Sequence, residues 1–162
     1  MSEHRMTVQA NWRGSSQAGA GELSSEGLRS TFSTPRDLGG AGKGTNSEEL
    51  VLGAAAVCYL ITLAVMLGKR GVPFDTLDVT TEGTLLFDKG LQLVSLSHHP
   101  RITLLATATA AHREATLDAA RQAEQSCMVA RAMRGNVAIS VHPVVAVTPA
   151  GDERTGAPAL QA

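Results

Sequence analysis

Aromatic residues, unbalanced charge and cysteine are all scarce in this 162-residue sequence. Three Phe, one Tyr and one Trp are too few for a base-stacking platform, and a net charge of -1 gives no electrostatic basis for binding nucleic acid or an acidic membrane. Two cysteines are too few for a disulfide scaffold. The 43% of hydrophobic residues instead indicates a compact aliphatic domain, in which the cysteines form half a metal site, a redox pair or part of the packing.

Residues 1–13 contain no apolar run, so we expect no secretory signal. Residues 50–67 form an uncharged run of 18 residues. This length is the lower limit for a transmembrane span. A helix that is apolar on every face also suits the buried centre of a soluble domain or oligomer. We therefore expect a soluble, cytoplasmic protein with no membrane partner, and keep the membrane span as an alternative.

The amino-terminal third predicts a small antiparallel meander followed by a loop. Short β-prone stretches occur within 7–12, 19–24 and 28–33, and the second and third are separated by a Ser-Glu-Gly turn. Residues 35–44 are too rich in glycine for regular structure. The capping residues at 45–47, followed by two glutamates, then predict the start of a long helix.

The remainder alternates between strands and one further helix. Pro73 ends the first helix, and Asp88-Lys89-Gly90 predicts a hairpin turn between two strands. Pro100 is expected to interrupt the second strand. The sequence predicts strands at 76–86, 91–97, 101–108 and 137–147, and one helix over 112–133. We therefore expect an α+β fold with a single domain over 1–148 and a disordered tail over 149–162.

Neither cysteine has a local signature that fixes its role. Cys58 and Cys127 are 69 positions apart, each on a predicted helix, with no Cys-x-x-Cys pattern. A closed zinc site needs four ligands, and no pair of histidines stands near either cysteine, so we expect neither a metal nor a cofactor. Taken alone, each local sequence favours a small buried hydrophobic residue.

Longer motifs give these positions another meaning. Residues 44–50 read Gly-Thr-Asn-Ser-Glu-Glu-Leu, and they are followed by Ala-Ala at 54–55 and Cys-Tyr at 58–59. Residues 126–129 read Ser-Cys-Met-Val near the end of the second predicted helix. The chain resembles the family of osmotically inducible protein C and organic hydroperoxide resistance proteins (OsmC/Ohr), over about residues 7–147. Where that family has Pro, Phe, Pro and Ser, this sequence has Ser47, Tyr59, Met128 and Ala130.

The resemblance implies a thiol peroxidase without a cofactor. Cys58 matches the family's attacking thiolate, which reduces an organic hydroperoxide, or hydrogen peroxide, and becomes a sulfenic acid. Cys127 matches the cysteine that condenses with it to an intramolecular disulfide. A dithiol, lipoyl-linked in the family's hydroperoxide branch, then restores both thiols. The alternative is a divergent OsmC-fold protein without enzymatic activity, which binds a ligand or a partner and uses its cysteines for packing.

The resemblance also implies a cation that favours the Cys58 thiolate. The family holds an arginine with a glutamate, and Glu48 matches the glutamate. Arg13 and Arg36 both match the arginine, and we favour Arg13. Since ten residues of helix span about 15 Å, Glu48 acts on Cys58 only through such an arginine.

The family's fold is an intertwined homodimer with mixed and antiparallel sheets wrapped around central helices. A long helix that is apolar on every side fits such an oligomer independently of the resemblance, because a small monomer cannot bury all of its faces.

Overall fold

The computed structural model describes residues 3–149, which form two compact units divided between Val51 and Leu52. Each unit is described by itself. The expected single domain over 1–148 stays a prediction, and the expected disordered tail lies, apart from Pro149, outside the described residues.

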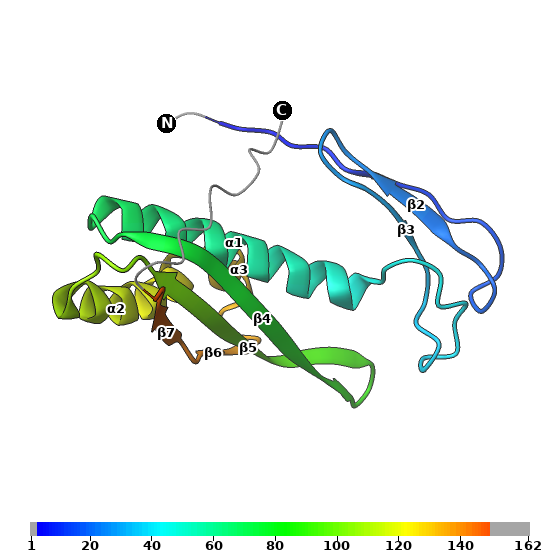
Figure 1. Cartoon of the computed structure of the whole chain (residues 1–162). Coiled ribbons are helices and arrows are strands. Elements are labelled where there is room, and N and C mark those ends of the chain that lie inside the picture. The colour runs from blue at the N-terminus through cyan, green and yellow to red at the C-terminus, as the bar shows by residue number, and fades with distance from the viewer. Residues whose placement is uncertain (1–2, 150–162) are drawn as a thin grey trace. The chain divides into compact units, whose positions relative to one another are not determined.

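The first unit contains the expected meander. Strands β1 (Gln9–Ala10), β2 (Gly21–Ser24) and β3 (Arg29–Phe32) pair antiparallel in the order β1-β2-β3 (Figure 1). A glycine-rich loop follows, in which Gly44 has a φ of 67° and lies so close to the Thr31 carbonyl that a side chain would collide with it. This close approach lets the Thr45 N–H donate to Thr31 at 2.9 Å and delivers the chain to the first helix.

Helix α1 (Ser47–Lys69) begins and ends where local signals predict. The Asn46 side chain accepts a hydrogen bond from the Glu49 N–H at 2.8 Å, which satisfies one free donor of the first turn. At the other end Gly71 adopts a φ of 64°, and the Val72 N–H donates to the Leu67 carbonyl at 3.1 Å. The expected helix over this stretch is confirmed.

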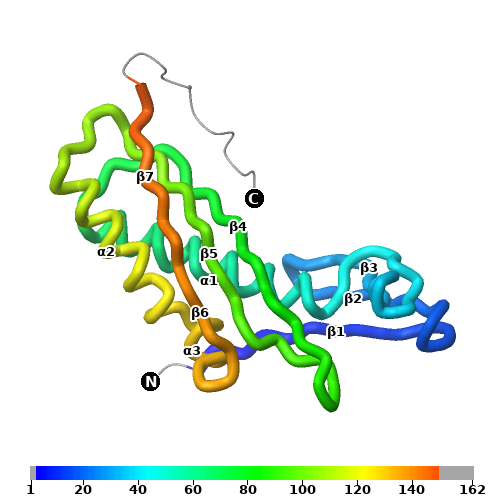
Figure 2. Tube along the Cα trace, turned by 90° about the horizontal axis from the view of Figure 1, so that it is seen from below, coloured from blue at the N-terminus to red at the C-terminus, as the bar shows by residue number. Residues whose placement is uncertain are grey.

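The second unit contains a four-stranded sheet with β5 at its centre. Strand β4 (Phe74–Phe87) and strand β5 (Leu91–Leu104) form a long antiparallel hairpin. Strands β6 (Ala138–Val141) and β7 (Val144–Val147) each pair parallel with β5 on its other side (Figure 2). The predicted hairpin turn is confirmed, with Lys89 and Gly90 both at positive φ.

Three boundaries predicted from the sequence are wrong, two of them in strands and one in the second helix. Strand β5 continues through Pro100 to Leu104, instead of stopping there and resuming over 101–108. Pro100 is tolerated because β6 pairs with β5 as far as His98 and β7 begins only at Arg101, so neither strand needs a hydrogen bond from Pro100. The predicted final strand divides at His142 and Pro143, where proline lacks the N–H that a continuous ladder requires.

The predicted helix over 112–133 is also two helices, α2 (Ala110–Ser126) and α3 (Met128–Met133). Thr109 caps α2 and accepts from the His112 N–H at 3.3 Å. The break falls at Cys127, where ψ is 126° and the backbone is extended. The apolar spacing continues across the break, which is why the sequence pattern suggested one helix.

The core of the second unit lies where α1, α2 and β5 meet. Ala55, Tyr59, Leu63 and Leu67 form the buried side of α1, while Val57, Ile61 and Val65 are half or more exposed. The small residues Ala119, Ala120 and Ala123 let α2 approach the other elements closely. Helix α1 is long and apolar enough to span a membrane by length and composition, yet only one side of it is buried in this chain.

A buried histidine packs beside this core. His98 is 1% exposed, stacks on Tyr59 with ring centroids 4.7 Å apart, and shares a hydrogen bond of 2.8 Å with the Thr81 hydroxyl. Burial, aided by the nearby charge of His99, lowers the pKa of His98 from 6.5 to about 4. Since the charged form is disfavoured, His98 is neutral in the folded protein at neutral pH.

We expect His98 to make folding stability pH-dependent. In the unfolded chain His98 takes up a proton below pH 6.5, whereas in the folded chain it does so only near pH 4. The neutral, buried His98 therefore contributes fully to folding stability above pH 6.5, and this contribution is lost as the pH falls toward 4. The loss is roughly 3 kcal/mol at most. Urea unfolding of wild type and His98→Gln between pH 4 and 7 measures it. Equal slopes in the two proteins would contradict the assignment, and His4→Gln, at an exposed position, is the control.

Candidate active site

Cys58 lies beside the buried side of α1. Its neighbour Tyr59 is fully buried and donates a hydrogen bond from its hydroxyl to the Ala120 carbonyl at 3.0 Å, which fixes how α1 faces α2. One position before this anchor, Cys58 is partly exposed. The Thr62 hydroxyl donates to the Cys58 carbonyl at 2.8 Å one turn further along the helix. Cys58 is therefore held at the edge of the core, within reach of solvent.

Cys127 occupies the break between α2 and α3 and is 1% exposed. Its N–H donates to the Ala123 carbonyl at 2.9 Å, and its carbonyl accepts from the Arg131 N–H at 3.0 Å. The residue thus ends one helix and begins the next. Its extended backbone turns the chain so that the first residues of α3 approach α1.

The two thiols make contact, although they are 69 positions apart in the sequence. Partial burial alone would raise the pKa of Cys58, but hydrogen bonds from the Cys127 thiol and from the N–H groups of Val129 and Met128, together with the nearby polar Thr62 side chain, lower it below the ordinary thiol value. Donors directed at a sulfur stabilise its negative charge. Cys58 is therefore the thiol of this pair that ionises first.

Cys127 shifts in the opposite direction. Burial, together with hydrogen bonding to Cys58 and repulsion from its developing charge, raises the pKa of Cys127. Cys58 thus ionises more readily than an ordinary thiol, while ionisation of its neighbour Cys127 is disfavoured. Such a pair can attack an electrophile with the first sulfur and then form a disulfide with the second.

The other predicted site residues belong to the first unit. Arg13 forms a two-way backbone bridge with Ala20, its N–H donating at 2.9 Å and its carbonyl accepting at 3.0 Å, and lines a cavity of about 250 Å³ with Asn11 and Glu22. The Arg36 side chain lies along Gly42, which has a φ of 56° and no side chain to obstruct it. Glu48 accepts a hydrogen bond from the Ser47 hydroxyl at 3.0 Å in the first turn of α1.

A sequence profile described as OsmC-like protein matches residues 40–142. The chain belongs to this family. Its carboxylate, imidazole and thiol groups form no cluster of three or more that could hold a metal ion within residues 3–149.

Known relatives agree with this membership. The chain is 34% identical over 146 residues to the uncharacterized protein YmaD of Bacillus subtilis (strain 168), covering 90% of this chain and 97% of YmaD. It is 33% identical over 86 residues to peroxiredoxin OsmC of Escherichia coli (strain K12), covering 48% of this chain and 55% of that protein. An organic hydroperoxide resistance protein OsmC from Legionella pneumophila superposes with a TM-score of 0.66 at 25% identity, covering 90% of this chain and all of the other.

The α+β fold expected from the sequence is therefore confirmed as the OsmC-like fold. At the level of the family, the comparisons support a peroxiredoxin-like redox role.

Some groups around Cys58 were not apparent from the sequence. Thr62 stands four residues after Cys58, a spacing that places two side chains on one helix face. The sequence shows this spacing, but the spacing alone does not indicate a functional site. The N–H groups of Met128 and Val129 carry no side-chain signature at all. They reach Cys58 only because the chain breaks at Cys127, where the family's following proline is replaced by Met128.

Proposed function

We propose that this protein is a cysteine-based peroxidase that reduces organic hydroperoxides to alcohols. The observation that carries the proposal is the contact between Cys58 and Cys127, in which the pKa of the first thiol is lowered and that of the second is raised. Two cysteines used only for packing need no hydrogen-bond donors directed at one sulfur, nor partial exposure of it. The contact therefore supports an enzyme over a binding module of the same fold.

The reaction begins at the Cys58 thiolate. Its sulfur attacks the terminal oxygen of ROOH, the O–O bond breaks, and the alkoxide leaves as ROH after taking a proton. Cys58 is oxidised to a sulfenic acid and the peroxide is reduced by two electrons. The Met128 and Val129 N–H groups face the sulfur and stabilise the Cys58 thiolate before this attack.

The Cys127 thiol completes the oxidative half. Its sulfur attacks the sulfenic sulfur of Cys58, an S–S bond forms, and the hydroxyl leaves as water with the thiol proton. A dithiol reductant then exchanges with this disulfide, leaving two protein thiols and an oxidised reductant. Because Cys127 is buried, we expect the reductant to enter from the side of Cys58.

Organic hydroperoxides are the substrate class that suits this site. Val57 and Ile61 are both more than half exposed on α1 next to Cys58 and Thr62, so an alkyl group approaching Cys58 meets aliphatic surface. Contact with such a surface favours binding of an alkyl substituent by roughly 0.8 kcal/mol of free energy for each CH₂ group that is buried. We therefore expect cumene hydroperoxide to be preferred over hydrogen peroxide.

We further propose that Arg13, held by Glu48, favours the Cys58 thiolate, and keep Arg36 as the alternative. Arg13→Gln is then expected to slow the reaction of Cys58 with cumene hydroperoxide by about ten- to a hundredfold and to raise the pH at which the rate is half-maximal. Stopped-flow rates between pH 5 and 9 for Arg13→Gln and Arg36→Gln identify the arginine. If neither variant changes the pH profile, the donors around Cys58 suffice without an arginine.

The assembly proposed is a soluble, cytoplasmic homodimer. Its support is the exposed apolar side of α1, where Val57, Ile61 and Val65 recur at four-residue steps, so the proposed interface borders the Cys58 site and Val57 and Ile61 contribute to both. An apolar stripe of this kind on an otherwise packed helix suits burial against a second copy of the chain.

Steady-state assays of the purified protein test the proposed function. With cumene hydroperoxide and an excess of dihydrolipoamide, we expect many turnovers per protein chain and slower turnover with hydrogen peroxide. Absence of peroxide consumption, with both thiols still free for alkylation afterwards, would favour the non-enzymatic alternative.

A further inference from the structure

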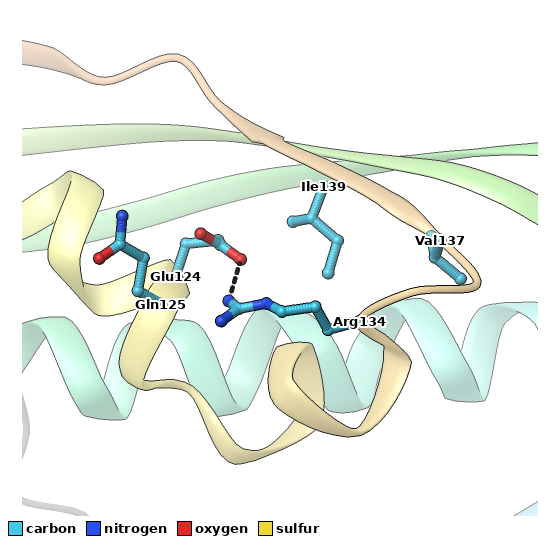
Figure 3. Close-up of a pocket in the computed structure, with 5 residues that line it drawn as sticks. All are labelled: Glu124, Gln125, Arg134, Val137 and Ile139. Atoms are coloured by element: carbon cyan, nitrogen blue, oxygen red, sulfur yellow. Dashed lines mark hydrogen bonds and ion pairs between the residues drawn. The ribbon is translucent and has the colours of Figure 1, made fainter.

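An ion pair spans the segment that contains Cys127. Glu124 lies near the end of α2, and Arg134 directly follows α3. Their side chains meet with 3.0 Å between Arg134 Nη2 and Glu124 Oε1, as Figure 3 shows. The Glu124 side chain is 16% exposed and the Arg134 side chain is 53% exposed, so this pair is shielded from solvent on the glutamate side only. The two charges therefore tie together the ends of the stretch in which Cys127 lies.

Apart from the buried side chains of Cys127 and Ala130, few features of this stretch hold it in place. Helix α3 has six residues, a length that is unstable without tertiary contacts. Cys127, at the N-cap position of α3, makes no side-chain capping bond. Met128, the next residue, is 72% exposed. The orientation of α3 thus depends on its contacts with the rest of the second unit, α2 above all.

A pocket of about 290 Å³, open to solvent, lies between the end of α2, the residue after α3 and the start of β6. Glu124, Arg134, Gln125, Val137 and Ile139 line it (Figure 3). The ion pair crosses this pocket and joins the end of α2 to the residue that follows α3.

The position of α3 matters for the chemistry at Cys58. The Cys127 thiol and the first N–H groups of α3 face the Cys58 sulfur, and all belong to the closed stretch. Condensation needs the two Cα atoms within about 7 Å and a defined dihedral angle, so a small displacement of α3 reduces the reactive population. We propose that the Glu124–Arg134 ion pair positions Cys127 for attack on oxidised Cys58, and thereby protects Cys58 from overoxidation.

The proposal rests on the proposed peroxidase function and adds a competition between two reactions. In one, Cys127 attacks the Cys58 sulfenic acid and water leaves. In the other, a second hydroperoxide oxidises the sulfenic acid to sulfinic acid and is itself reduced to alcohol. Slower attack by Cys127 leaves more time for the second reaction. Glu124 and Arg134 are therefore positioning residues that act through Cys127.

The test follows the two steps separately in Glu124→Gln and Arg134→Gln. Rapid quenching with an alkylating agent and mass spectrometry measure sulfenic acid, disulfide and sulfinic acid after mixing with cumene hydroperoxide. We expect disulfide formation to slow about tenfold, sulfenic acid formation to slow less than about threefold, and the sulfinic fraction to increase. The swapped double variant Glu124→Arg/Arg134→Glu is expected to recover most of the lost rate.

Two control variants separate positioning from general stability. Arg131→Gln removes an exposed charge of α3 that takes part in none of the ion pairs within residues 3–149. Asp118→Asn breaks the other ion pair of α2, with Arg70 at 2.9 Å. Both are expected to form the disulfide at the wild-type rate.

Wild-type disulfide kinetics in Glu124→Gln and Arg134→Gln would overturn the positioning role and leave the peroxidase intact. Equal slowing in Asp118→Asn, or no recovery in the swapped variant, would also overturn it. If neither thiol of the wild-type protein reacts with hydroperoxide, that result would instead overturn the proposed function, and this inference with it.

Discussion

Cys58→Ser is expected to lose peroxide turnover by at least about a thousandfold. A serine hydroxyl stays protonated at neutral pH and cannot be oxidised to a sulfenic acid, so both the attacking sulfur and the redox centre disappear. Because Cys58 is partly exposed and its neighbour Tyr59 anchors α1, the variant should retain the fold. The measurement is steady-state consumption of cumene hydroperoxide with dihydrolipoamide as the reductant.

Thr62→Val is a milder variant for comparison with Cys58→Ser. It removes one hydroxyl near Cys58 while leaving both sulfurs in place, so the rate should fall far less than in Cys58→Ser. Circular dichroism and thermal unfolding verify that both variants are folded. Turnover by folded Cys58→Ser at a rate near that of the wild type would exclude Cys58 as the attacking residue.

Cys127→Ser is expected to react once and then stall. Cys58 still attacks the peroxide and releases the alcohol, but no second thiol is present to form the disulfide. Without added thiol, one equivalent of hydroperoxide should yield a Cys58 sulfenic acid that dimedone traps, and excess hydroperoxide should convert it to sulfinic acid. Intact-protein mass spectrometry with and without dimedone measures both products.

The buried position of Cys127 requires a second variant. A serine hydroxyl placed at a site that is 1% exposed destabilises the fold by roughly 1–3 kcal/mol if it finds no partner. Cys127→Ala carries no polar atom there and should give the same trapped sulfenic acid. Sustained turnover in both variants, without sulfenic acid accumulating, would contradict a resolving role for Cys127.

Much of the fold was predictable because its signals are local. The ends of α1 depend on Asn46, Gly71 and Pro73, and the hairpin turn depends on Lys89 and Gly90. The errors arose where tertiary context decides. Strand β5 runs through Pro100 because neither β6 nor β7 pairs with that residue on their side of β5, and the helix breaks at Cys127 without a nearby glycine or proline.

The candidate site was predictable only in part for the same reason. No spacing rule brings together two cysteines that are 69 positions apart, and local sequence favoured packing for both. The family motifs suggested a redox pair, and the fold places the two thiols in contact. The N–H donors of Met128 and Val129 and the Glu124–Arg134 ion pair depend on how α3 is oriented, which no side-chain pattern encodes. The roles of Arg13, Arg36 and Glu48 stay predictions.

The most direct test of the account is to locate the sulfur chemistry after a single oxidation. Wild-type protein is mixed with one equivalent of cumene hydroperoxide, alkylated without reductant, digested and mapped by mass spectrometry. We predict that the peptides containing Cys58 and Cys127 are joined within one chain, with neither cysteine alkylated. Recovery of both cysteines in alkylated form after the hydroperoxide treatment would contradict it.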